Sequence, residues 1–295
     1  MDPKIFLEEQ SLNNFPSGLG GCKGENQSFE CCEYNITIFD NKTEDDLIIE
    51  YENELVKVHH GSLSETNSNV LIQYHNLQII LDEQWELRML LSKINEKKQE
   101  IFRDYAKSCL IDVLFCASKT KDGLENSDPF ASSWVKCGAY FLADAISGFN
   151  FQRPSPTHML EHVRALEKNR INEHFSVVND CIGIERATPS LLSRMCKSTI
   201  GFSDMVETNN YSKIIQKKHD YLVNNGLLAD CYFYLDYINR NNMIRIKDTL
   251  QQKPELIHVL KVGFDIENDA TKVEKQANLL QKTANELLSL PKPHD

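Results

Sequence analysis

Two kinds of hydrophobic pattern divide the chain. Up to residue 83, short apolar runs alternate with turn residues, and this pattern predicts a mixture of strands and short helices. Four runs rich in β-branched and apolar residues predict strands: 36–39, 47–51, 55–59 and 77–81. Two further segments, 5–12 and 64–74, have the spacing of short helices.

After Asp82 the apolar residues recur with helical spacing. A long helix is predicted from Trp85 toward Phe115, and a polar loop follows over 119–128. The next predicted helix, 130–146, is rich in small apolar residues, which allow neighbouring helices to approach closely. Further helices are predicted over 155–168, 172–182, 188–206, 210–225, 228–239, 242–263 and 265–288. The fold class is therefore α+β, with a small mixed β-sheet domain at 1–83 and an all-α helical bundle domain at 84–295.

Composition excludes some classes of protein. The chain has 295 residues, 41% hydrophobic and 25% charged, which is ordinary for a soluble globular protein. Its formal net charge of -11 argues against non-specific binding of nucleic acid, which needs a basic surface. No apolar run approaches the length of a membrane span, and the N-terminus lacks the order of a signal peptide, so we expect no membrane association. Nine scattered cysteines without a Cys-x-x-Cys pair predict a reducing, cytoplasmic location.

The stretch from Gly20 to Asp40 carries the candidate chemistry. A glycine turn is followed by a polar excursion and then by a strand. Glu33 and Asn35 are two residues apart, so on a strand their side chains point to the same face. Two oxygen-bearing side chains facing a glycine turn could hold a hard cation and the phosphates that it bridges.

This stretch resembles the nucleotidyltransferase fold of the DNA polymerase β superfamily. That family has a Gly-Ser turn and then Asp-x-Asp on a strand, and in the aminoglycoside nucleotidyltransferases a helical bundle follows. Here Gly21 and Cys22 stand where Gly-Ser would be, and Gly24 supplies a second glycine. Glu33 and Asn35 have the spacing of Asp-x-Asp.

The resemblance implies both a fold and an activity. It makes residues 1–83 a nucleotidyltransferase-like domain, which would transfer a nucleoside monophosphate from a nucleoside triphosphate to an acceptor hydroxyl with Mg²⁺. Glu33 and Asn35 would be the catalytic and metal-binding residues. The nucleotide would contact Gly20, Gly21, Cys22 and Gly24.

Four departures from the family pattern weaken the implied metal site. Glu33 is one methylene longer than aspartate, and Asn35 carries no negative charge. Cys22, in place of serine, is only a weak hydrogen-bond donor. The strand that carries the third carboxylate in the family has Lys57 and His59 here and no acid. Since Mg²⁺ prefers carboxylate and phosphate oxygens in octahedral geometry, we favour a degenerate, inactive transferase-like domain over a working enzyme.

Two functional hypotheses follow from these residues. In the first, the chain is a nucleotidyltransferase acting on a nucleotide and an unknown acceptor. In the second, it is a pseudoenzyme that binds a nucleotide or a protein partner in the same cleft. The long first helix and the small-residue helix are compatible with a homodimer.

Two further motifs have a chemical and an ordinary interpretation. The sequence His-Met-Leu-Glu-His at 158–162 matches the His-x-x-Glu-His pattern of inverted zinc peptidases, but a packing helix explains it better. Cys31 and Cys32 are adjacent and cannot form an ordinary disulfide with each other. We expect packed cysteines there, with a reactive thiol as the alternative.

Charged residues in the helical part also bear on the site. Asp144 interrupts the most apolar predicted helix, so it needs a partner or a shifted pKa, and it is a candidate to face the cleft between the domains. Lys213, Lys217 and Lys218 form a basic run that we interpret as a solvated helix face.

Overall fold

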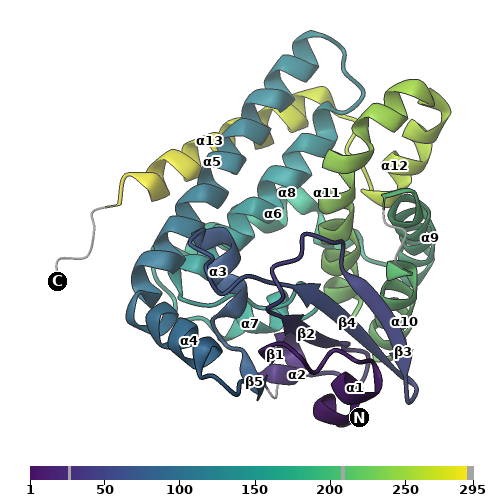
Figure 1. Ribbon diagram of the computed structural model, residues 1–295. Helices are drawn as coiled ribbons and strands as arrows, with labels where there is room; N and C mark the ends of the chain where they lie inside the picture. Colours follow the sequence, from purple (N-terminus) through teal and green to yellow (C-terminus); the bar gives the residue numbers. More distant parts are fainter. Residues whose placement is uncertain (26–27, 207–209, 291–295) are drawn as a thin grey trace.

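The computed structural model describes residues 1–25, 28–206 and 210–290 of the chain. It confirms the α+β class, with a small mixed sheet first and helices afterwards (Figure 1). The sheet has the order β3-β4-β2-β1-β5. Its strands are β1 (Ser17–Gly20), β2 (Tyr34–Ile38), β3 (Leu47–Tyr51), β4 (Glu54–His60) and β5 (Gln78–Leu81). β2 and β4 are parallel, and the other neighbouring pairs are antiparallel.

Helices occupy most of the remaining chain. Three short ones belong to the sheet region: α1 (Pro3–Glu9), α2 (Gly21–Gly24) and α3 (Ser68–Tyr74). The helical region contains α4 (Glu86–Glu96), α5 (Lys98–Glu125), α6 (Ala131–Phe149), α7 (Met159–Ala165), α8 (Phe175–Ile182), α9 (Pro189–Val206), α10 (Tyr211–Asn224), α11 (Leu228–Gln252), α12 (Ile257–Gly263) and α13 (Ala270–Leu288). Three 3₁₀ turns lie at Asn172–His174, Ile184–Arg186 and Pro254–Leu256.

The two faces of the sheet have different chemistry because side chains alternate along each strand. One face is apolar and packs against Phe6 and Leu7 of α1. Its buried residues are Leu19, Ile36, Ile38, Val56 and Val58. Apart from Leu55, the alternate positions on β2 and β4 carry polar residues, and the parallel register sets Asn35 beside Lys57 and Thr37 beside His59. This polar face is where the sequence places the candidate site.

Helix α6 forms the centre of the helical region, as its small residues predicted. It runs beside α5 and α13, with α8 and α11 on its other sides (Figure 1). An added Cβ at Gly138 would lie 3.2 Å from the Cβ of Cys116, and one at Gly148 would lie 3.1 Å from the Cβ of Ala106. These contacts show why the α5–α6 interface needs small side chains.

The structure differs from the predicted elements at several boundaries. Residues Ser17–Gly20, where the sequence predicted no strand, form the buried strand β1 between β2 and β5. Lys97 separates α4 from α5, so the predicted long helix is two helices. The helix predicted from Ser155 begins only at Met159, because a turn that includes Pro156 comes first.

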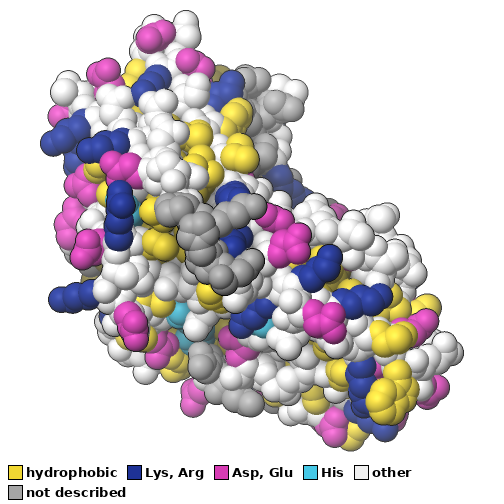
Figure 2. All heavy atoms as spheres, turned by 90° about the vertical axis from the view of Figure 1, so that its left-hand side faces the viewer, with side chains coloured by type: hydrophobic (Ala, Val, Ile, Leu, Met, Phe, Trp, Pro, Cys, Tyr) yellow, Lys and Arg dark blue, Asp and Glu magenta, His cyan; other side chains and the backbone are white. Residues whose placement is uncertain are grey.

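The surface in Figure 2 shows acidic and basic side chains interspersed, with hydrophobic side chains between them. Neither sign of charge forms a continuous band on the part of this face whose side chains are coloured. Among the described ranges, no helix combines the length and the apolar character that crossing a membrane requires.

Candidate functional site

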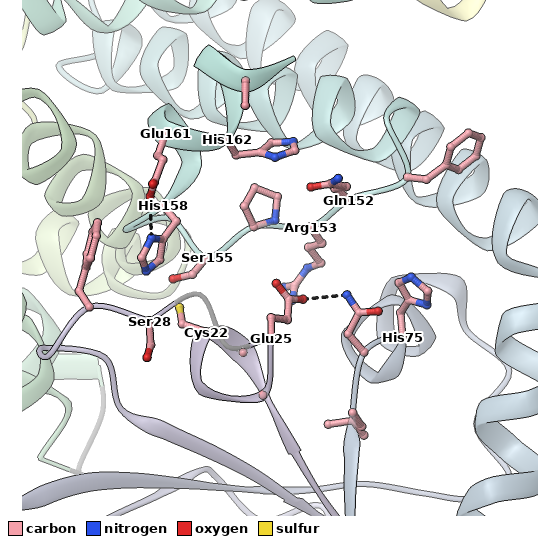
Figure 3. Close-up of a pocket in the computed structure, with 18 of the residues that line it drawn as sticks. Cys22, Glu25, Ser28, His75, Gln152, Arg153, Ser155, His158, Glu161 and His162 are labelled. Carbon is pink, nitrogen blue, oxygen red and sulfur yellow. Dashed lines mark hydrogen bonds and ion pairs between the residues drawn. The ribbon is translucent and has the colours of Figure 1, made fainter. Parts of the chain in front are cut away.

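A cleft of 1120 Å³ lies between the glycine turn after β1 and the segment that joins α6 to α7 (Figure 3). Gly21, Cys22, Gly24 and Glu25 line it on the sheet side. The helical side contributes Gln152, Arg153, Ser155, His158, Glu161 and His162, and a third side contains His75 and Lys98. The cleft therefore joins the sheet to two separate parts of the helical region.

The glycine turn has a backbone shape that only glycine adopts easily. Gly21 has a φ of 62°, in the left-handed region. An added Cβ there would lie 2.7 Å from the Nδ2 atom of Asn35. Gly20 pairs directly with Asn35 in the register of β1 and β2. The turn and the candidate ligand Asn35 are therefore in contact, as the sequence pattern suggested.

Glu33 lies in a buried ion pair beneath α10. Its carboxylate Oε2 is 2.7 Å from the Nζ of Lys218, and the side chains are 10% and 3% exposed. The Nδ2 of Asn35 donates a hydrogen bond of 3.4 Å to Oε1 of Glu33. Burial alone would raise the pKa of Glu33, but the Lys218 ammonium outweighs it and the pKa falls to about 2. Glu33 is thus an ionised carboxylate that already has a cationic partner.

The same polar network continues across β4. The Oδ1 of Asn35 lies 3.3 Å from Nε2 of His59, and Nδ1 of His59 lies 2.7 Å from Oδ1 of Asp46. The Nζ of Lys57 is 2.9 Å from Oδ2 of Asp46. Although burial opposes the charged form, His59 and Lys57 hold the pKa of Asp46 well below its usual range. Each acid in this network therefore has a lysine beside it.

Helix α10 supplies the lysine that the sequence analysis assigned to a solvated face, and that interpretation was wrong. Lys218 is 2% exposed and also lies over the ring of Tyr234 at 5.2 Å. Two neighbouring lysines pair with acids near the β3–β4 turn. Lys213 is 2.9 Å from Glu50, and Lys217 is 3.1 Å from Glu54. The basic run attaches α10 to the sheet.

Two histidines of the cleft carry buried ring nitrogens without a hydrogen-bond partner in the described part of the chain. They are Nδ1 of His75 and Nε2 of His162. Burial, together with the nearby Lys98, lowers the pKa of His75 to about 4, and burial lowers the pKa of His162. Both imidazoles are therefore neutral at pH 7.

Two cysteines and a histidine meet at one end of the cleft. The Sγ atoms of Cys22 and Cys32 and the Nε2 of His158 all lie within 4.8 Å of one another. The Sγ of Cys32 is 3.4 Å from Nε2 of His158, whose Nδ1 lies 3.2 Å from Oε2 of Glu161. The ring of Phe29 lies against His158 with centroids 4.1 Å apart and the ring planes tilted by 37°. A hydrogen bond with Cys32 and burial raise the pKa of the Cys22 thiol.

The predicted site residues are close together but occupy two environments. Gly21, Cys22 and Gly24 line the cleft. Glu33 and Asn35 are not among its lining residues; they lie behind the glycine turn, in the network with Lys218. The buried Gly20 is the last residue of β1.

Asp144 has the partner that its position in an apolar helix required. Its Oδ2 is 2.6 Å from Nη1 of Arg240, and the hydroxyl of Tyr237 donates to the same carboxylate. Asp144 is not among the residues that line the cleft, so its predicted position facing the cleft was wrong.

Comparisons with known proteins give limited information. No family model and no curated protein matches this chain. Among solved structures, it is similar to a nucleotidyltransferase-like protein from Exiguobacterium sibiricum 255-15, with 9% identity and a TM-score of 0.30. The match covers 86% of this chain and 91% of that one. A likeness of this size implies no shared activity or substrate.

Proposed function

We propose that this protein is a binding module that takes a nucleotide, or another phosphorylated ligand, in the cleft without transferring a nucleotidyl group. The buried Glu33–Lys218 ion pair is the observation that carries this proposal. Two-metal transfer needs carboxylates that are free to bind cations and align an in-line displacement. Here the ammonium of Lys218 neutralises Glu33, and the Nδ2 of Asn35 donates a hydrogen bond to the same carboxylate.

Magnesium fits these residues poorly. A magnesium ion would have to displace Lys218 from a buried carboxylate, which would leave the ammonium without its partner in a low-dielectric environment. Asn35 supplies a neutral oxygen, and that oxygen faces His59 at 3.3 Å. At the position of a third carboxylate the strand carries Lys57, which pairs with Asp46.

The lining of the cleft supports a phosphorylated ligand. Lys98 and Arg153 supply positive charge on two sides of the cleft. Ammonium and guanidinium groups bind the anionic oxygens of phosphates. Phe29 and Phe151 supply aromatic surface for a flat apolar group, and the neutral side chains of His75 and His162 also line the cleft. The volume of 1120 Å³ is slightly above the roughly 300–1,000 Å³ typical of small-molecule sites, so the cleft has room for a ligand of that size.

Binding and turnover of nucleoside triphosphates test this proposal together. We expect calorimetry to detect binding in the absence of Mg²⁺, and we expect no release of pyrophosphate from a labelled triphosphate when Mg²⁺ is added. Magnesium-dependent turnover above the background of a Glu33→Gln variant would refute it. No binding of any common triphosphate, diphosphate or monophosphate would refute the ligand class.

A pair of neighbouring lysines offers a matched control. Lys98 lines the cleft, whereas the exposed Lys97 does not. We expect Lys98→Gln to weaken binding about 10- to 150-fold, which corresponds to losing a hydrogen bond to a charged group of about 1.5–3 kcal/mol. Lys97→Gln should leave the dissociation constant unchanged. Equal losses in the two variants would show that general charge, rather than this cleft, binds the ligand.

A further inference from the structure

We infer that Cys22, Cys32 and His158 form a site for one zinc ion at the end of the cleft. Two thiolates and an imidazole are the ligand types that zinc selects, and all three belong to different segments that the fold brings together. The inference does not rest on the proposed nucleotide binding, because it concerns a different set of atoms.

The distances match the size of a zinc site. Zinc–sulfur bonds of about 2.3 Å and zinc–nitrogen bonds of about 2.0–2.1 Å place tetrahedral ligand atoms about 3.5–3.8 Å apart. The Cys32 Sγ and His158 Nε2 atoms are 3.4 Å apart. All three ligand atoms lie within 4.8 Å of one another, so the widest pair needs to close by at most about 1 Å.

The surroundings of His158 support the same conclusion. Glu161 lies 3.2 Å from Nδ1 and so favours a proton on that nitrogen, which leaves the lone pair of Nε2 directed at the two sulfurs. Metal-binding histidines usually have such a carboxylate behind them, because it fixes the tautomer and the orientation of the ring. The ring of Phe29 packs against the imidazole at a tilt of 37°, with centroids 4.1 Å apart. Figure 3 shows Cys22 below His158, with Glu161 above it.

The fourth zinc position would face the cleft. Cys22 and His158 both line the cleft, whereas Cys32 is fully buried behind them. A zinc ion bound by three protein ligands keeps a position for water or for an oxygen of a ligand. Binding converts the two thiols to thiolates and releases their protons to solvent. The ion would also connect the β1–β2 region to the start of α7.

Cobalt is a suitable probe, because thiolate-bound Co²⁺ absorbs light and Zn²⁺ displaces it. The reduced full-length protein should bind one Co²⁺ per chain with a thiolate-to-cobalt charge-transfer band, and stoichiometric Zn²⁺ should abolish that band. Cys32→Ala and His158→Asn should each remove it. Matched controls are Cys31→Ala, the adjacent buried cysteine outside the cluster, and His162→Asn, the histidine one helical turn away; both should retain the band.

Glu161→Gln keeps the inference testable if the buried variants do not fold. Its side chain is 65% exposed, so the substitution should leave the fold intact while weakening metal affinity about 10- to 100-fold. The inference is overturned if the reduced protein gives no charge-transfer band or if the Cys31 and Cys32 variants lose it equally. A Cys22–Cys32 disulfide with no metal binding after reduction would overturn it as well. These titrations contain no nucleotide, so their failure would leave the proposed function standing.

Discussion

Replacing Lys218 by methionine should destabilise the protein far more than an ordinary surface substitution. Methionine has a similar length and would fill much of the same space, but it would leave the Glu33 carboxylate buried without its 2.7 Å partner. Breaking a buried ion pair by removing one member costs about 3–5 kcal/mol. The variant Lys218→Met should therefore lose a free energy of unfolding of that size at pH 7.

The neighbouring lysine provides the control for this substitution. Lys217 pairs with Glu54 at 3.1 Å, but these side chains are 32% and 28% exposed. Partly exposed pairs contribute about 0–1 kcal/mol, so Lys217→Met should change stability little. Both variants would be measured by urea unfolding followed by circular dichroism, with the slope of the transition compared to check for two-state behaviour.

A double variant separates pairing from burial. Glu33→Gln together with Lys218→Met removes both charges, and replacing a whole buried pair is often neutral or even stabilising. The double variant should therefore recover most of the stability that Lys218→Met loses. If Lys218→Met costs less than about 1 kcal/mol, or if the two substitutions simply add, then Glu33 and Lys218 are not coupled and the reasoning fails.

Two other expectations concern the same region. Because the pKa of Glu33 falls from 4.5 to about 2 on folding, its stabilising effect is complete above about pH 5 and is lost as the pH falls toward 2. The stability difference between the native protein and Glu33→Gln should shrink over that interval, and a constant difference in acid unfolding curves would contradict it. Gly21→Ala should cost at least about 1 kcal/mol, since φ is 62° and the new Cβ would lie 2.7 Å from Asn35 Nδ2. Gly201→Ala, in the interior of α9 with nothing within 4 Å, should instead stabilise by about 0.5–1 kcal/mol, and thermal melting that ranked these variants in the opposite order would refute the account.

Much of the fold was predictable because its signals are local. The period of two residues along a strand correctly placed Glu33 and Asn35 on one face, and the change to helical spacing after Asp82 located the helical region. Strand β1 was missed because it has only four residues and two of them are glycine, which rarely predicts a strand. Its strand conformation depends on pairing with β2 and β5 on either side. The single-residue break at Lys97 has no strong sequence signal.

The site was predictable only in part, because periodicity reveals faces but not the distant elements that cover them. The spacing of α10 gave no indication that Lys218 would meet Glu33, and a basic run most often faces solvent. The cluster of Cys22, Cys32 and His158 escaped notice for the same reason, since His158 lies 126 residues after Cys32. The His-x-x-Glu-His pattern did mark His158 and Glu161, but their cluster partners are two cysteines rather than His162.

The three lysines of α10 also determine how the molecule responds to salt and how it can move. The outer pairs, Lys213–Glu50 and Lys217–Glu54, are open to solvent and weaken as ionic strength rises. The inner pair, Lys218–Glu33, is shielded from mobile ions and persists. Moving α10 away from the sheet would have to separate these two buried charges, so we expect the helix to stay attached to the sheet even when salt weakens the outer pairs.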